Sequence, residues 1–164
     1  MLNPEQLKKE AEKKRDENKN FYASLKKQDD RKLDKVFHEL HYEIFADFDC
    51  LSCANCCKTT SPLFQERDIE RLSKHLKIKP MEFTEKYLRK DEDNDWVLKS
   101  SPCPFLDNEN YCLVYEARPS ACREYPHTNR KRIKQIQKIH FENTFICPAV
   151  FEITEKAKIE LKKA

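Results

Sequence analysis

Four of the chain's eight cysteines lie in one short stretch, CLSCANCC, at positions 50–57. Cys50, Cys53 and Cys56 have the spacing C-x2-C-x2-C, and Cys57 follows directly. Two intervening residues let the chain turn around one metal centre so that successive thiolates converge, and zinc and iron–sulfur sites share this spacing for that reason. The stretch could supply disulfide partners, a catalytic thiol pair or metal ligands, and its spacing favours metal ligands.

The cellular compartment expected for the protein affects the choice between disulfides, catalytic thiols and metal ligands. The N-terminal residues lack the apolar stretch of a secretory signal, and no run approaches the roughly 18 apolar residues of a membrane span. We therefore expect a cytoplasmic protein without a membrane partner. Cysteines rarely persist as structural disulfides in that reducing compartment, so their density favours metal binding or thiol chemistry.

The other four cysteines, Cys103, Cys112, Cys122 and Cys147, are expected in turns or at element boundaries. Buried structural thiols usually sit inside apolar helices or strands, so this placement argues against simple core cysteines. Eight thiolates could fill two four-coordinate sites, or one centre with further thiols nearby. Adjacent residues rarely point the same way, so Cys56 and Cys57 are not expected to bind one metal ion together.

Cations are expected near these cysteines, because a metal held by four thiolates carries net negative charge and its ligands must lose protons. Lys58 and Arg123 lie beside cysteines in the sequence, and Arg118 lies a turn away from Cys122. Arg118 and Arg123 are therefore candidates for cations that surround the metal-bound sulfurs.

The order of these motifs resembles a known family. The resemblance, over about residues 48–150, is to the YkgJ family of cysteine-cluster proteins, also described as the CxxCxxCC zinc- or iron-chelating domain. That family usually has glycine and arginine where this chain has Ala54 and Lys58. The motifs that carry the resemblance are Cys50-x2-Cys53-x2-Cys56-Cys57, Asp68, Pro102-Cys103-Pro104-Phe105-Leu106, Cys112-x2-Tyr115, Arg118-Pro119-x2-Cys122-Arg123-x-Tyr125-Pro126 and Cys147.

The resemblance implies a metal-binding domain, often one that contains an iron–sulfur cluster. Together with the ferredoxin-like spacing and two Cys-Pro pairs, at Cys103 and Cys147, it favours an iron–sulfur cluster, [4Fe–4S], over zinc. All eight cysteines are candidate ligands, and Asp68 is a candidate orienting group on a helix. No catalytic residue can be assigned, and Asp68 and His127 are candidates only because they lie near the motifs.

Two alternative functions remain open. One related group, the flagellin lysine N-methylases, joins such a cysteine domain to S-adenosylmethionine-dependent methylation, so the resemblance allows a cluster-dependent enzyme. The other alternative is a zinc-stabilised module that binds another protein.

Composition excludes several other classes. The chain has no glycine, and P-loop and dinucleotide-binding motifs need glycines to bring the backbone close to phosphate. The net charge of +3 comes from 32 basic and 29 acidic residues, a near balance that does not favour a nucleic acid partner. The basic stretch at 130–138 also lacks interleaved aromatic residues.

The pattern of apolar residues predicts a mostly α fold with a small β-hairpin (α+β), in which metal staples a small cysteine-rich domain. Two domains are expected, a charged N-terminal helical segment at 1–47 and a cysteine-cluster domain with a C-terminal helix at 48–164. A hairpin is expected at 100–115, with Asn108 or Asn110 in its turn at positive φ. Other expected elements are helices at 4–27, 30–46, 65–76 and 80–89, a short strand at 96–98, a short turn or one-turn helix around 117–128, a helix or strand at 130–145, and a helix from Pro148.

The N-terminal helix has its own signals. Asn3 is the expected N-cap, with Pro4 in the first turn and Gln6 completing a capping box. Few apolar residues follow, so we expect its first half to be solvated, or else to lie on the surface or meet a partner helix. A protein partner through this segment is a further expectation.

Overall fold

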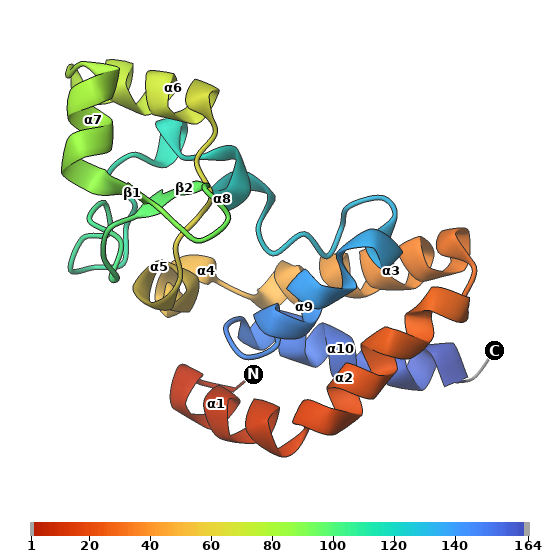
Figure 1. Cartoon of the computed structure of the whole chain (residues 1–164). Helices are drawn as coiled ribbons and strands as arrows, with labels where there is room; N and C mark the ends of the chain where they lie inside the picture. The colour runs from red at the N-terminus through yellow and green to blue at the C-terminus, as the bar shows by residue number, and fades with distance from the viewer. Residues whose placement is uncertain (1, 163–164) are drawn as a thin grey trace. The chain divides into compact units, whose positions relative to one another are not determined.

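The computed structural model describes residues 2–162 and is mostly helical, with one two-stranded antiparallel sheet. The predicted mostly α fold with a small β-hairpin is confirmed. Among these residues no helix has both the length and the apolar character needed to cross a membrane. The elements in Figure 1 are α1 (Pro4–Lys13), α2 (Arg15–Ser24), η1 (Leu25–Lys27), α3 (Asp30–Asp47), α4 (Cys50–Cys53), α5 (Asn55–Thr59), α6 (Glu66–Leu76), α7 (Pro80–Tyr87), β1 (Leu88–Lys90), β2 (Trp96–Leu98), η2 (Tyr115–Ala117), α8 (Ser120–Glu124), η3 (Ile133–Ile136), α9 (Gln137–Asn143) and α10 (Pro148–Lys162).

The chain forms two compact units. Unit 1 contains Met1–Cys53 and Pro126–Ala164, and unit 2 contains Ala54–Tyr125. The division between the units therefore falls inside the stretch CLSCANCC. The expected domains at 1–47 and 48–164 stay a prediction.

In unit 1, α3 and α10 form the central helix pair. The buried residues of α3 follow the helical spacing that predicted this helix, and those of α10 begin at Pro148 as expected. Burial of one apolar stripe from each helix supplies the main stabilisation of the unit. The buried apolar residues are Leu33, Phe37, Leu40 and Ile44 from α3 and Ala149, Val150, Phe151, Ile153 and Ala157 from α10.

The N-terminal segment is also part of unit 1. The predicted capping box is confirmed, because Asn3 Oδ1 accepts a hydrogen bond from Gln6 N at 2.9 Å and Gln6 Oε1 accepts one from Asn3 N at 3.1 Å. The expectation of a solvated first half is wrong. Leu7 and Ala11 are fully buried in a cluster with Phe151, because two apolar residues four apart suffice to dock one helical face.

The predicted single helix at 4–27 is instead divided into α1, α2 and η1. Polar contacts join α2 to α10 where apolar residues are scarce. Tyr22 Oη lies 2.7 Å from Thr154 Oγ1, and Lys158 Nζ donates to Asn18 Oδ1 at 3.0 Å. Charged and hydroxyl side chains thus dock α2 on α10, although the composition of this segment is typical of a solvated helix.

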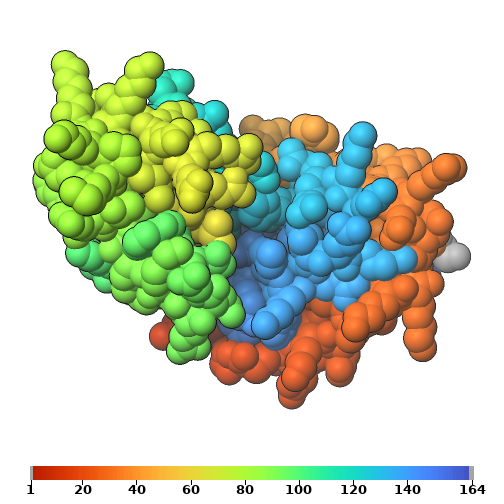
Figure 2. Space-filling model, turned by 45° about the horizontal axis from the view of Figure 1, so that its top comes forward, coloured from red at the N-terminus to blue at the C-terminus, as the bar shows by residue number. Residues whose placement is uncertain are grey.

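In unit 2, the helical hairpin of α6 and α7 packs with the β1–β2 sheet (Figure 1), and the side chains of the two helices form a continuous surface (Figure 2). In the sheet, Leu88 pairs with Leu98 and Lys90 with Trp96. The core of this unit contains Phe64, Ile69, Leu72, Phe83, Leu88, Leu98, Phe105, Val114 and Ala117, with Cys103 and Cys112 packed against it.

The hairpin does not lie where the sequence indicated. The expected strand at 96–98 is present, but it pairs with 88–90, which was predicted to be the end of a helix. Asp91 Oδ1 accepts hydrogen bonds from the N–H groups of Asp93 and Asp95, and this local capping favours a tight turn over helix continuation.

The stretch 100–115 holds only one isolated bridge, between Leu106 and Cys112, so the hairpin predicted there is wrong as a strand pair. Its turn does use Asn110 at φ 68°, as expected for a chain without glycine. The short helix expected around 117–128 is confirmed as α8, and 130–145 is helical as η3 and α9.

One buried histidine, His140 of α9, makes the stability of unit 1 sensitive to pH. It is fully buried, stacks on Phe37 with ring centroids 5.8 Å apart, and its Nε2 lies 3.2 Å from the carbonyl oxygen of His127. Burial lowers the pKa of His140 to about 4, and the hydrogen bond with the His127 carbonyl opposes this shift only weakly. The folded state therefore holds the neutral imidazole over a range where the unfolded chain is protonated.

We predict that this contribution is fully present above pH 6.5 and is lost as the pH falls towards 4. The loss in the free energy of unfolding is about 3 kcal/mol at most. Urea unfolding of the wild type and of His140→Leu at several pH values measures it. Carboxylates titrate in both proteins, so equal pH slopes for the two would contradict the assignment.

Candidate metal centre

The cysteine stretch consists of two short helices separated at Ala54. Cys50 and Cys53 lie in α4, whereas Cys56 and Cys57 lie in α5. Ala54 has φ 45° and ψ 18°, a left-handed conformation that glycine adopts without steric cost. The backbone conformation explains the glycine usual at this position in the similar family.

We predict that Ala54→Gly stabilises the protein, because the left-handed conformation costs a residue with a Cβ about 1 kcal/mol. The control is Ala23→Gly on the exposed face of α2, where the same change should destabilise by about 1 kcal/mol. Thermal unfolding of the three proteins checks both signs. A lower melting temperature for Ala54→Gly would show that the backbone there is not strained.

In unit 2, a backbone hydrogen bond connects two cysteine segments. Cys103 N donates to the carbonyl oxygen of Cys57 at 2.8 Å. The turn that follows Cys103 is held by Leu106 N, which donates to the Cys103 carbonyl at 3.1 Å. The ring of Phe105 anchors this turn in the core, stacked on Phe83 at 6.2 Å and tilted against Tyr87 at 4.9 Å.

Cys112 and Cys122 come from neighbouring parts of the same unit. Cys112 forms the bridge with Leu106, and Leu113 N donates to the carbonyl oxygen of Phe105 at 2.8 Å, which joins this segment to the turn after Cys103. Cys122 lies in α8, where its N–H donates to the Pro119 carbonyl at 3.0 Å. Local turns and one-turn helices therefore position both thiols.

Cys57 of unit 2 ionises more readily than an ordinary cysteine, because its pKa is lowered. A hydrogen bond from the Cys56 thiol lowers the pKa of Cys57 to about 7, partly opposed by burial and assisted by the charge of Lys58. Near neutral pH this sulfur is therefore a thiolate in a large fraction of molecules, as a metal ligand must be.

The thiols of Cys103, Cys112 and Cys122, which lie in the same unit as Cys57, are held protonated. Burial raises the pKa of Cys103 to about 11 and that of Cys122 to about 12, and it also raises the pKa of Cys112. A negative charge on Cys57 raises all three pKa values further, whereas Arg118 lowers those of Cys112 and Cys122. The four sulfurs share one electrostatic neighbourhood and can all ionise only if more positive charge enters it.

Backbone N–H groups point at the Cys103 sulfur. The N–H groups of Phe105 and Leu106 hydrogen-bond it and partly offset the effect of burial on its pKa. Pro104, which has no N–H, lies between Cys103 and these two donors. The Cys-Pro pair thus builds a small nest of donors that favours the thiolate.

The second Cys-Pro pair repeats this arrangement in unit 1. Cys147 precedes α10, and the N–H groups of Ala149 and Val150 hydrogen-bond its sulfur in the manner of an N-cap. Burial nevertheless raises the pKa of Cys147 to about 12, and negative charge on Cys50 or Cys53 raises it further. The three cysteines of unit 1 therefore form a group of their own.

The donor set in each group suits a soft metal, because thiolates select zinc, copper(I) and iron–sulfur clusters. In the part of the chain that the structure describes, no three Cys, His, Asp or Glu side chains converge on a point that could hold one metal ion. The cysteines are thus gathered into neighbourhoods rather than into a finished coordination sphere. Their chemistry fits a thiolate-bound metal group.

Comparison with known proteins assigns the chain to a family. The family model "CxxCxxCC: Putative zinc- or iron-chelating domain" matches residues 49–144. The chain belongs to this family. No solved structure matches the chain. The match covers seven of the eight cysteines and ends before Cys147.

In this CxxCxxCC domain, Asp68 orients the segment that carries Cys122. The carboxylate is fully buried and accepts hydrogen bonds from Gln65 N at 3.1 Å, from Arg71 Nη2 at 2.6 Å and from the N and Oγ of Ser120, both at 3.1 Å. Burial by itself would raise the pKa of Asp68, but these donors together outweigh it and lower the pKa.

Arg71 extends the Asp68 network. It also donates to the carbonyl oxygens of Ala117, at 3.2 Å, and Arg118, at 2.8 Å. Together with the Asp68–Ser120 hydrogen bonds, these contacts join α6 to the backbone on both sides of Pro119. The sequence analysis did not single out Arg71, although its position three residues after Asp68 on a helix was a usable signal.

We predict that Asp68→Asn lowers the free energy of unfolding by about 2–4 kcal/mol, because it breaks a buried ion pair and puts an amide N–H₂ group among donors. Glu66→Gln, on the exposed side of the same helix, is the control and should change it by less than about 0.5 kcal/mol. Chemical denaturation of both variants provides the comparison. Similar small effects would mean that Asp68 does not hold this segment.

The two predicted arginines have different surroundings. Arg118 is half-buried beside the cysteines, whereas Arg123 is exposed and its Nη2 donates to the Glu116 carbonyl at 2.8 Å. The histidines of α3 make hydrogen bonds within unit 1, His38 to the carbonyl of Arg130 at 2.9 Å and His41 to Thr128 Oγ1 at 2.7 Å.

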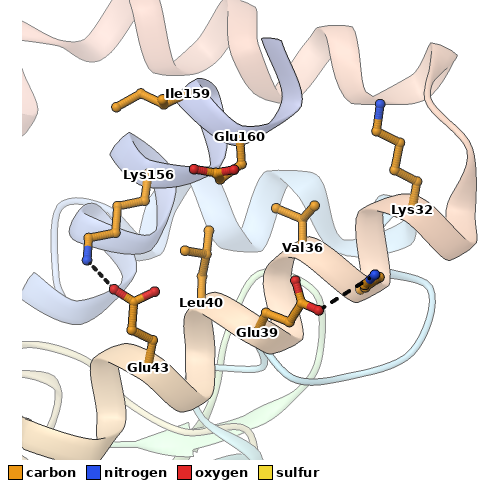
Figure 3. Close-up of a pocket in the computed structure, with 9 residues that line it drawn as sticks. Lys32, Val36, Glu39, Leu40, Glu43, Lys156, Ile159 and Glu160 are labelled. Atoms are coloured by element: carbon orange, nitrogen blue, oxygen red, sulfur yellow. Dashed lines mark hydrogen bonds and ion pairs between the residues drawn. The ribbon is translucent and has the colours of Figure 1, made fainter. Parts of the chain in front are cut away.

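A separate hollow of about 660 Å³ lies between α3 and α10 in unit 1 (Figure 3). Val36, Leu40 and Ile159 supply its apolar part, and the rest of its lining is charged. Lys156 pairs with Glu43 at 2.6 Å, so opposite charges on its rim neutralise one another. Its lining includes no cysteine, and its charge pattern selects no class of ligand.

Proposed function

We propose that this CxxCxxCC domain binds a [4Fe–4S] cluster through Cys57, Cys103, Cys112 and Cys122. The observation that carries the proposal is their shared electrostatic neighbourhood, in which each buried thiol is kept protonated by burial and by the charge of Cys57. A metal cluster supplies the positive charge that lets all four ionise. Its binding would release protons and stabilise the unit that carries the ligands.

Two features of the proposed ligands support a cluster over a single zinc ion. Cys103 is followed by proline, as is the last cysteine of the bacterial ferredoxin run. In this structure each Cys-Pro pair places two N–H donors on a sulfur. Hydrogen bonds to sulfur are among the features that set the reduction potential of an iron–sulfur cluster.

The remaining cysteines are proposed as further ligands. Cys50, Cys53 and Cys147 form the second group, in unit 1, and Cys56 hydrogen-bonds Cys57 in unit 2. A second metal centre in unit 1 would account for the repeated Cys-Pro arrangement there. Cytoplasmic location and a protein partner for the N-terminal segment also stay predictions, and Leu7 and Ala11 of that segment already lie in a core of unit 1.

Anaerobic purification followed by iron, zinc and acid-labile sulfide analysis tests the proposed cluster. We expect iron and sulfide in equal amounts and the broad visible absorption of iron–thiolate bonds. Cys112→Ser should lose most of both, whereas Ser52→Ala, which removes a side-chain oxygen between two cysteines, should lose neither. A colourless protein with stoichiometric zinc would contradict the proposal.

A further inference from the structure

The guanidinium group of Arg118 carries hydrogen-bond donors that the chain leaves without acceptors. Its Nε and Nη1 atoms are buried and have no hydrogen-bond partner among residues 2–162. A buried donor without a partner destabilises the fold, and more so on a charged group. Two such donors on one side chain indicate that an acceptor belongs beside them.

The position of Arg118 is fixed from several sides. Its Cζ lies 3.6 Å from the centroid of the Tyr115 ring, and its carbonyl oxygen accepts the 2.8 Å hydrogen bond from Arg71. Pro119 follows and restricts the backbone at that point. The fold itself therefore holds the side chain in place. The free-energy cost of its two unpaired donors is offset only when an acceptor binds beside them.

Backbone hydrogen bonds tie the segment of Arg118 to two of the cysteines. Tyr115 N donates to the Cys112 carbonyl at 3.2 Å, and Arg118 N donates to the Tyr115 carbonyl at 3.4 Å. On the other side of Arg118, Cys122 N donates to the Pro119 carbonyl at 3.0 Å. Arg guanidinium groups present N–H donors in a rigid fork that suits anions with two acceptors. Metal-bound thiolates and cluster sulfides are such acceptors.

Arg123 provides a natural contrast within the same motif. It carries the same charge and lies next to Cys122 in the sequence, but it is exposed and donates to the carbonyl oxygen of Glu116. Solvent around its exposed guanidinium screens its charge. The two arginines differ in burial and in free donors rather than in charge.

We propose that Arg118 is a positioning residue whose Nε–H and Nη1–H donate to sulfur atoms of the metal centre and thereby raise its reduction potential. This inference rests on the proposed cluster. One-electron reduction adds one negative charge to the cluster while the external donor, dithionite in the experiment below, is oxidised. A buried cation and two N–H donors stabilise the reduced form more than the oxidised form.

The test is a dithionite titration of the anaerobically purified full chain, followed by visible absorption and electron paramagnetic resonance. The proteins are the wild type, Arg118→Gln, Arg118→Lys and Arg123→Gln. We expect the midpoint potential to shift downward in Arg118→Gln and to stay at the wild-type value in Arg123→Gln. Arg118→Lys, which keeps the charge without the fork, should lie between them.

Three results would overturn the inference: an unchanged potential in Arg118→Gln, an equal shift in Arg123→Gln, or a wild-type potential in Arg118→Lys. Iron and sulfide content and circular dichroism are measured on each protein. If Arg118→Gln folds without a cluster, Arg118→Lys decides the question, because it keeps the positive charge while removing the guanidinium donors. A wild-type protein without iron and sulfide would instead overturn the proposed cluster.

Discussion

Sulfur atoms that are buried close together can all ionise only when positive charge is placed among them. In unit 2 this constraint acts on Cys57, Cys103, Cys112 and Cys122, since the first is readily ionised and its charge opposes ionisation of the others. Arg118 supplies part of the required charge. A bound metal group supplies the rest. The four sulfurs are therefore better described as a binding site for a cation than as independent free thiols.

The rest of unit 2 serves to place these sulfurs. An aromatic cluster fixes the turn after Cys103, and a backbone hydrogen bond ties that turn to Cys57. Asp68 and Arg71 hold the backbone at Arg118 and Ser120 from α6. The carboxylate thus acts on the site through structure rather than by touching a metal, which is the kind of outer support that metal ligands usually need.

Several features could be predicted because their causes are local. The Asn3 capping box, the α3 stripe, the start of α10 at Pro148 and the family itself all follow from short patterns in the sequence. The position of the hairpin could not, because its turn depends on hydrogen bonds from the Asp91 side chain that the apolar pattern does not report. The burial of Leu7 depends on α10, about 140 residues away, and no local pattern reports such a contact.

The candidate site was predicted as a set of cysteines, but the spacing did not indicate which of them belong to the same unit. Spacing alone joins Cys53 to Cys56, whereas the structure places the division between units at Ala54. X-ray absorption at the iron and zinc edges of the anaerobically purified protein tests the central claim most directly. A [4Fe–4S] cluster predicts iron surrounded by sulfur, with further iron atoms in the next shell. Zinc surrounded by sulfur alone, or metal bound through nitrogen and oxygen, would contradict it.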